Sequence, residues 1–536
     1  MNLSRAGTAF GLLTVLAGSV RAQSLGLAPD RDLPLWLTRW SVLAPRADLP
    51  RYLPSAATAI PVSLLSKTAI GLFWTAGNPA GLAGTIDSAR TVFFAALARA
   101  RGDFRRPLDP GGSDLKQLSA TSWRQLDPRV ALLGRVVFDQ ERLDPGTQAD
   151  ETEPYPSSPF LTTDTSTTAV RRTRARLEGV AGWNLGAWSL GADLGYDVRE
   201  NQTVEAGLSR RSRQTLSGAA LGMARRLGGL RAGLTGRYRN RTEGLLLIER
   251  AAEGQGVELE GYRDVTPFSI FQSYSRRIEE DIASLSWAME GRFGVGHWVL
   301  FGERAQLKER RALQEQDNPP VDRWNARSWT VGGAYQRPLG TPERWALSLD
   351  AHLVWLNGDG DLALDATGTM FTAKERQLNA HAELRLLQAA SGWTGLIAVT
   401  SRQERRHRND LVAGIGSDIK TLDLGLAVEI GRALTPEITL LGTSALLSRV
   451  SNSAIPDPEL RGIVYRRLIA PELDFYARNM VPWSVGGALR WQVSARTGLW
   501  LTARTETVQP RGQGPTAFGP RGDRTISTVL VGLVMK

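Results

Sequence analysis

Two pairs of histidine and carboxylate residues are the part of this sequence best suited to acid–base or metal chemistry. His352 follows Asp350 by two positions, and Glu383 follows His381 by two positions. Residues two apart on a strand share a face, so each pair could transfer a proton or bind a metal ion. The alternative is that both histidines complete a polar hydrogen-bond network. Which interpretation holds depends on the secondary-structure elements that carry the two pairs and on where these elements place the side chains.

A second candidate site for an ion follows the first histidine. Asn357, Asp359 and Asp361 place oxygen ligands at alternating positions, an arrangement that could hold Ca²⁺ in a loop. The run N-G-D-G-D lacks the full EF-hand pattern, and it is also typical of an ordinary turn. The calcium site is therefore one of two interpretations of this loop.

A serine hydrolase site is not supported by the remaining histidines. His407 lies six residues after Ser401 in a basic stretch, but no nucleophile elbow or triad spacing accompanies it. We expect no enzyme activity and no nucleotide or redox cofactor.

The stretch Arg344–Asn357 indicates the element that carries the first pair. Its apolar residues and its polar residues alternate strictly, as in a strand with two different faces. Trp345 and Trp355 bracket the apolar face. At about 3.3 Å per residue and a tilt of about 40° they stand roughly 25 Å apart along a membrane normal. This spacing matches the apolar band of a transmembrane β-barrel.

The same alternation recurs along the chain and predicts an all-β fold. We expect an antiparallel transmembrane β-barrel of about 18 strands (range 14 to 18) with an N-terminal luminal plug. The expected strands are 90–103, 116–126, 130–141, 172–183, 187–199, 214–226, 230–242, 280–293, 298–309, 327–336, 344–356, 376–388, 393–405, 419–432, 438–448, 483–493, 499–507 and 525–535. An even number places both ends of the barrel chain on one side.

The connections between these strands alternate in length. Short turns are expected at 127–129, 184–186, 227–229, 294–296, 339–343, 389–392, 435–437 and 494–498. Long polar connections lie at 142–171, 243–279, 309–326, 357–375 and 449–482. Short periplasmic turns and long outer loops are typical of bacterial barrels.

Aromatic residues are expected to form two girdles at the membrane interfaces. One girdle lies beside the short turns: Trp183, Trp188, Trp298, Trp345, Trp393, Trp491 and Trp500. The other lies toward the long loops: Tyr196, Trp287, Trp329, Trp355 and Trp483. The polar faces of the strands point into the lumen, and they carry Arg237, Asp350, His352, His381, Glu383 and Arg385.

The last expected strand, 525–535, departs from the usual pattern. Its alternation is blurred, since Val529 and Val531 lie opposite Leu530 and Val534, and the chain ends Met535-Lys536 without an aromatic residue.

The N-terminus has the features of an export signal. A basic start, an apolar run from Ala6 to Val20 and the small-residue site V-R-A predict cleavage after Ala22. The domains are then a signal peptide (1–22), an N-terminal plug segment (23–88) and a transmembrane barrel (89–536). The chain has no cysteine, which excludes disulfides and thiolate chemistry.

Directly before the first expected strand stands the run Asn78, Pro79, Ala80, Gly81, Leu82. It resembles the N-terminal motif of the outer-membrane long-chain fatty-acid transporter superfamily. The resemblance implies a plug folded inside the mouth of the barrel and a hydrophobic solute. The alternative is an ordinary Pro-Gly turn.

The net charge of +11 is carried mainly by arginine. Lumen arginines could brace the wall through ion pairs or favour passage of anions. Loop arginines, among them Arg402, Arg405, Arg406 and Arg408, could bind phosphates of lipopolysaccharide in the outer-membrane lipid. Nucleic acid is not an expected partner, because the arginines are dispersed along the chain.

These features predict an outer-membrane barrel that transports a small hydrophobic or anionic molecule past a plug. The alternative is a non-conducting structural or assembly barrel whose long outer loops bind a protein partner.

Overall fold

The fold was analysed in a computed structural model of the chain. It describes residues 78–82, 89–107, 109–149, 160–203, 209–248, 256–260, 263–268, 274–294, 296–313, 322–339, 345–361, 370–386, 393–455, 465–512, 514 and 519–535. The expected signal peptide and most of the expected plug segment lie outside these residues and stay predictions. None of the helices in the described ranges is long and apolar enough to cross a membrane.

The described chain is built almost entirely from strands. They are β1 (Arg90–Gly102), β2 (Gly112–Asp127), β3 (Val130–Ala149), β4 (Phe160–Leu185), β5 (Trp188–Thr203), β6 (Ser209–Leu227), β7 (Leu230–Ile248), β8 (Gly256–Glu260), β9 (Arg263–Phe268), β10 (Tyr274–Phe293), β11 (Gly296–Leu313), β12 (Asp322–Leu339), β13 (Trp345–Asp361), β14 (Phe371–Leu386), β15 (Trp393–Asp410), β16 (Ile415–Ala433), β17 (Ile438–Ala454), β18 (Met480–Gln492), β19 (Thr497–Pro510) and β20 (Arg524–Met535). Three short helical elements accompany them in the described ranges: η3 (Pro79–Leu82), η5 (Tyr465–Ile469) and α5 (Ala470–Ala477).

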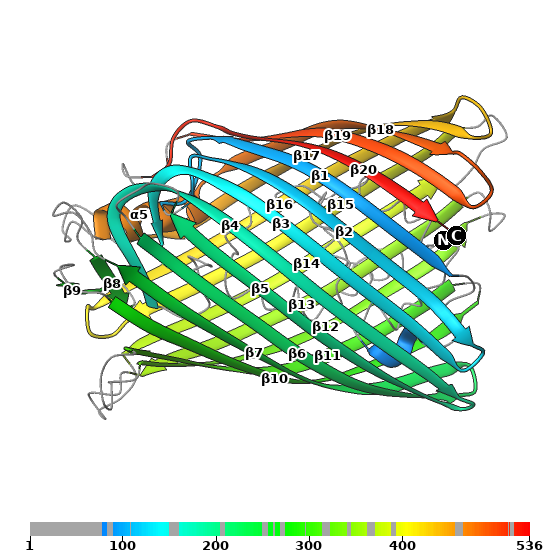
Figure 1. Cartoon of the computed structure of the whole chain (residues 1–536), viewed down its shortest axis with the longest axis horizontal. Coiled ribbons are helices and arrows are strands. Elements are labelled where there is room, and N and C mark those ends of the chain that lie inside the picture. Colours follow the sequence, from blue (N-terminus) through cyan, green and yellow to red (C-terminus); the bar gives the residue numbers. More distant parts are fainter. Residues whose placement is uncertain are drawn as a thin grey trace, which may run out of the picture.

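The strands pair into a closed ring. Among the described residues, β1–β7 and β10–β20 pair antiparallel in chain order, β7 pairs with β10, and β20 pairs with β1. These eighteen strands form the tilted cylinder of Figure 1, and the β8–β9 hairpin joins its long-loop end through β4. The expected antiparallel barrel of about eighteen strands is confirmed.

The two faces of the wall differ as the alternation requires. On β5, the buried side chains of Ser189, Asp193 and Asp197 point into the lumen, and Leu190 and Leu194 point outward and are exposed. The same outward exposure recurs around the described wall at Val136, Leu177, Leu221, Leu285, Val331, Ile397, Leu424, Leu446, Val485 and Val531. A monomeric soluble protein does not expose apolar surface on this scale, and in lipid a closed barrel satisfies every strand hydrogen bond.

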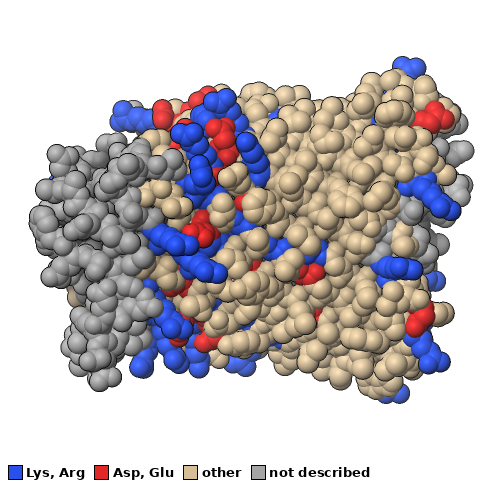
Figure 2. Space-filling model, in the orientation of Figure 1, with Lys and Arg blue, Asp and Glu red and all other residues tan. Residues whose placement is uncertain are grey.

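Charge is distributed unevenly along the outer surface. Figure 2 shows charged side chains gathered toward the long-loop end and a largely uncharged band next to it, toward the short turns. The chain is therefore an outer-membrane β-barrel with its apolar belt nearer the short-turn end.

The short turns are held by side-chain caps. Asp127 Oδ1 accepts hydrogen bonds from the backbone N–H groups of Arg129 (2.6 Å) and Val130 (2.9 Å). Asn184 Oδ1 accepts one from Gly186 (3.2 Å), whose φ of 81° needs a glycine. These turns connect β2 to β3 and β4 to β5.

The tryptophans are placed mostly as the alternation predicts. Trp183, Trp188, Trp393 and Trp491 are exposed near the short turns, and Trp287, Trp329 and Trp483 are exposed toward the long loops. The side chains of Trp345 and Trp355 lie outside the described part, although both residues belong to β13.

Trp500 is a correction to the expected girdle. Its side chain is buried in the lumen against Phe94, with ring centroids 5.2 Å apart. The outward positions of β19 are held by its neighbour Leu501, which is exposed. Proximity to a turn does not decide the face of a strand residue.

The strands reach further than the sequence predicted, above all at the long-loop end. β13 continues to Asp361 and pairs with β12 and β14, so Asn357, Asp359 and Asp361 lie on a strand. The expectation of a loop there is wrong. In the register, Asn325 lies opposite Asp359 and Lys374 opposite Asn357. The side chains of Asn357, Asp359 and Asp361 lie outside the described part, so calcium binding stays a prediction.

Candidate plug dock and lumen

The NPAGL segment, residues 78–82, lies inside the barrel. All five residues are buried, and η3 packs against the inward faces of β4, β5 and β6 near their short-turn ends. In Figure 1 it is the short blue helix drawn inside the cylinder, away from α5. These five residues are the described part of the expected plug segment.

Two glycines of the wall make room for the segment. A Cβ atom on Gly191 of β5 would overlap the backbone of Pro79 and Ala80, and one on Gly222 of β6 would overlap Asn78 Oδ1. Both positions are on the inward face of their strands. The wall is therefore bare backbone where the segment rests, and we call this surface the dock.

Hydrogen bonds orient the segment on the dock. Asn78 Nδ2 donates to the carbonyl oxygens of Met223 (3.3 Å) and Leu234 (3.2 Å), which are partners across β6 and β7. Asn78 Oδ1 accepts from the backbone N–H of Ala80 at 2.9 Å. Arg231 Nη2 donates to the carbonyl oxygen of Ala80 at 2.7 Å. An aspartate in place of Asn78 would have no N–H to donate to the wall carbonyls.

Apolar contacts complete the dock. Leu82 is fully buried in a cluster with the inward side chains Val92, Phe94, Ala96, Ala131, Val180, Trp500, Leu530 and Val534. Ala80 lies in a second cluster with Ala224, Ala288, Val299 and Phe301. This explains the blurred alternation of β20, because Val529 and Val531 face outward and Leu530 and Val534 pack inside near Leu82.

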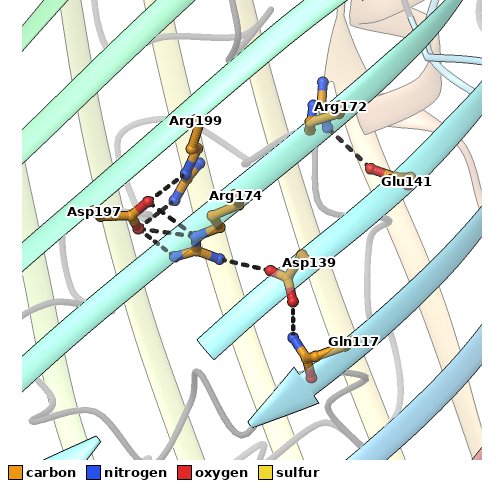
Figure 3. A network of polar contacts seen from close by, with 7 residues as sticks. All are labelled: Gln117, Asp139, Glu141, Arg172, Arg174, Asp197 and Arg199. Carbon is orange, nitrogen blue, oxygen red and sulfur yellow. Dashed lines mark hydrogen bonds and ion pairs between the residues drawn. The ribbon is translucent and has the colours of Figure 1, made fainter. Parts of the chain in front are cut away.

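Between the dock and the long-loop end, the lumen wall carries a network of opposite charges. Arg174 Nη2 lies 2.5 Å from Asp197 Oδ2, and its Nη1 lies 3.6 Å from Asp139 Oδ2. Asp139 accepts a hydrogen bond from Gln117 (2.6 Å), and Arg199 approaches Asp197 at 3.4 Å. Figure 3 shows these residues joined across β2, β3, β4 and β5, with Arg172 and Glu141 forming a separate pair at 3.3 Å.

The pairing continues around the wall. Arg237, an expected lumen residue, is buried and donates to Ser286 Oγ (2.8 Å) and Glu303 Oε1 (3.1 Å). Arg241 bridges Glu280 (3.4 Å) and Glu309 (3.5 Å). In the described part of the chain, buried arginines and buried carboxylates are about equally numerous. Because an unpaired buried charge is costly, these contacts brace the wall through ion pairs.

The histidine pairs are brought onto neighbouring strands. The register places Asp350 opposite His381, His352 opposite Asn379 and Ser348 opposite Glu383 on β13 and β14. The side chains of these residues and of Arg385 lie outside the described part. Among the described residues, no three His, Asp or Glu side chains cluster so as to hold a metal ion.

The inner wall at the long-loop end carries an assembly that we call the outer cap. It comprises η5 and α5 with Arg478 and the described parts of 103–110 and 514–523. Phe475 and Tyr476 of α5 pack with Phe104, and their apolar neighbours reach inward residues of several strands: Ile282, Ala305, Leu307, Trp324, Ala326, Phe371, Ile415, Ile419 and Val508. The cap thus fills the inner surface of β10–β12, β14, β16 and β19.

Buried polar contacts join the three chain segments of the cap, which connect β1 to β2, β17 to β18 and β19 to β20. Arg478 lies 3.2 Å from Asp474 and donates to the carbonyl oxygen of Pro520 at 2.9 Å. A Cβ on Gly519 would overlap Asp474. Arg106 pairs with Asp109 at 2.9 Å and donates to the Tyr476 hydroxyl at 3.2 Å.

Three of the expected loop arginines are on the inward face of β15, and two of them contact this cap. Arg406 stacks over the Tyr476 ring at 4.4 Å and pairs with Glu404, and Arg402 pairs with Glu404 at 2.6 Å. Arg408 lies 3.9 Å from Glu472. Arg405 alone of the four points outward, where it pairs with Asp418 at 3.0 Å. The stretch belongs to β15, so alternation sends every second residue inward.

The sequence did not predict the cap, because 449–482 reads as one long polar connection. Its signals are the apolar residues of Y-R-R-L-I-A-P-E-L-D-F-Y-A, with Pro471 in the first turn of α5. The dock glycines were also missed. Gly191 and Gly222 can be found only when the segment that rests on them is placed.

Comparisons with known proteins give a family and distant structural likenesses. The model of the "Family of unknown function (DUF6850)" matches residues 79–534, and no curated protein matches the chain. BauA, the ferric preacinetobactin receptor from Acinetobacter baumannii, shares 8% identity at a TM-score of 0.40, over 83% of this chain and 80% of that one. The copper transporter OprC shares 9% at 0.40, over 84% and 81%. Likenesses at this level carry no conclusion on function.

Proposed function

This chain belongs to the family of unknown function DUF6850, and we propose from its own geometry that it is a plugged outer-membrane transporter. Residues 23–88 form a plug that rests on the dock through the NPAGL segment. Release of that segment opens a route for a small hydrophobic or anionic molecule. The proposal includes cleavage after Ala22 and a barrel domain of 89–536.

The fit of the NPAGL segment on bare wall backbone carries this proposal. A glycine inside a strand weakens the strand unless another backbone approaches closely there. Gly191 and Gly222 both lie where Asn78, Pro79 and Ala80 approach. Such a fit supports a specific resting place for the segment inside the lumen.

Two features bear on the solute. The resemblance of the NPAGL segment to the fatty-acid transporter superfamily favours a hydrophobic molecule. Arg106 of the cap and Arg406 and Arg408 of β15 lie at the entrance, where an anionic molecule would compete with the carboxylates that pair with them. The lumen wall carries balanced charges, so selection of an anion would occur at this entrance.

The conductance of the refolded barrel in a planar bilayer tests the proposal. Gly191→Val should push Pro79 and Ala80 off the dock and convert a silent barrel into a conducting one. Gly195→Val is the matched control, because a Cβ at Gly195 on the same strand meets nothing within 4 Å. The proposal is wrong if Gly191→Val and Gly195→Val barrels conduct alike.

A second candidate is a non-conducting structural or assembly barrel whose long outer loops bind a protein partner. The interlocked cap supports it, because an entrance held by buried apolar contacts and ion pairs is costly to open. Deletion of residues 23–84 separates the two candidates. A deletion variant that conducts supports transport, and one that stays closed supports the binding barrel.

A further inference from the structure

The outward face of β20 and β1–β4 changes abruptly from apolar to basic. Strand register places Ser527, Arg99, Asp114, Arg142 and Arg171 side by side in one row across the strands. The next row toward the short turns contains Val529, Leu97, Lys116, Gln140 and Thr173, and the row after it Val531, Ala95, Leu118, Phe138 and Ala175. The boundary of the apolar belt therefore runs through these rows.

A groove of about 590 Å³ lies at this boundary. Among its lining residues, Leu97 and Val529 are apolar and on the outward face, Arg99, Lys116, Arg142 and Arg171 are basic, and Asp114 and Glu141 are acidic. Leu118 and Phe138, which continue the apolar surface beyond it, are exposed. The charged side chains of this face are visible near the long-loop end in Figure 2.

The groove has more positive than negative charge. Asp114 is shared by Arg99 (3.6 Å) and Arg101 (2.8 Å), and Arg101 also approaches Asp144 at 3.7 Å. Within the described part of the chain, Lys116, Arg142 and Arg171 have no carboxylate within ion-pair distance. Three cations beside an apolar surface fit a ligand with an anionic head and acyl chains.

We propose that this groove binds a phosphate group of lipopolysaccharide in the outer leaflet. The arginine forks match phosphate oxygens, Lys116 adds a point charge, and the acyl chains lie along Leu97, Leu118 and Phe138. A free anion would gain nothing from the apolar side of the groove. The site differs from the expected one at 402–408, three of whose arginines are directed inward.

The test compares lipid binding by the full mature chain and by two charge variants, measured by native mass spectrometry with phosphorylated lipid A. The site variant carries Lys116→Gln, Arg142→Gln and Arg171→Gln. The control variant loses the same charge at exposed arginines of the short-turn end, through Arg124→Gln, Arg129→Gln and Arg292→Gln. Each basic residue near a lipid surface contributes roughly fivefold, so the site variant should bind about 100-fold more weakly. The control variant should bind like the parent.

Two further probes identify the source of the phosphate. Dephosphorylated lipid A should bind the parent about as weakly as phosphorylated lipid A binds the site variant, and inorganic phosphate should not compete. Equal binding by parent and site variant, or undiminished binding of dephosphorylated lipid, overturns the proposal. Competition by inorganic phosphate at the lipid's own concentration also overturns it, because the site would then be one for a free anion.

A charge-preserving variant guards against misfolding. Lys116→Arg, Arg142→Lys and Arg171→Lys together should keep at least a third of the parent affinity. If this variant loses binding as fully as the glutamine variant does, while its heat-modifiable gel mobility shows a folded barrel, the charge of the groove is not what binds the lipid.

Discussion

Different kinds of contact hold the chain segments that lie inside the two ends of the lumen. At the long-loop end, the cap inserts aromatic and aliphatic side chains between inward residues of many strands and adds buried ion pairs. At the short-turn end, five small residues lie on wall backbone through a few hydrogen bonds and two apolar clusters. The cap is part of the folded wall, whereas the NPAGL segment can leave the dock without unpairing any strand.

The difference between these contacts indicates that the NPAGL segment, and not the cap, is the element that moves. An opening that removed the cap would expose Trp324, Phe475 and the Asp474–Arg478 pair, all buried. An opening at the dock exposes Leu82, Ala80 and the face of two glycines. We therefore expect the free energy of opening, measured by hydrogen exchange, to be larger for the cap than for the dock.

The largest effect is expected in the cap. Asp474→Ala leaves the Arg478 guanidinium buried without its carboxylate, which should cost about 3–5 kcal/mol of stability. Denaturant unfolding in lipid vesicles measures it. Asp418→Ala, which removes a half-buried carboxylate from the exposed side chains of Arg405 and Lys420, should cost less than about 1 kcal/mol. Equal costs would show that the cap pair is not buried as described.

Leu82→Ala should weaken the dock selectively. The change removes a fully buried side chain from its cluster, at a cost of about 2–5 kcal/mol. Exchange of the peptide covering residues 78–82 should accelerate, and that of α5 should not. Leu411→Ala, at an exposed leucine in the β15–β16 turn, should change neither. Accelerated exchange at both ends would mean that dock and cap open together.

Asn78→Ala should have a smaller effect at the same place. It removes the two hydrogen bonds donated to Met223 and Leu234, worth about 0.5–1.5 kcal/mol each because both carbonyls keep their places in the strand pairing. Asn78→Asp should cost at least as much, because a carboxylate repels those carbonyls. If aspartate is tolerated and alanine is not, the donated hydrogen bonds are not what holds the segment.

The smallest effect is a pH dependence of the cap. Burial of Glu472 in α5, helped by nearby Asp109, raises the pKa of its carboxyl against the opposing pull of Arg408 and Arg106. A raised pKa means that the cap is most stable below the ordinary value of about 4.5 and loses stability as the pH rises through the raised value. Glu472→Gln should abolish this loss in exchange measurements on α5. A loss that persists in Glu472→Gln must come from another group.

The strands could be predicted because contact with lipid requires an apolar side chain at every second position of each strand. All eighteen barrel strands were predicted, since an apolar residue at every second position marks the belt, as in Leu190 and Leu194 of β5. Their extensions above the belt were not, because both faces are polar there, as between Arg406 and Asp410 on β15. The β8–β9 hairpin was missed because it lies within 243–279, which was expected to be one long connection.

Tertiary contacts set the remaining details. Trp500 faces inward because it packs with Phe94 and Leu82, and the blurred pattern of β20 has the same cause. The cap and the dock bring together residues hundreds of positions apart, such as Arg106 and Tyr476. No local pattern marks such contacts.

The placement of the NPAGL segment on the dock is tested most directly by an engineered disulfide, because the chain has no cysteine of its own. Ala80 and Ala224 share an apolar cluster at the dock, whereas Ala445 belongs to a separate cluster on β17. The double variant Ala80→Cys and Ala224→Cys should form a bridge on oxidation in intact outer membranes, and the pair Ala80→Cys and Ala445→Cys should not. Failure of the first pair to bridge, or equal bridging by both, would contradict a segment docked on β5 and β6.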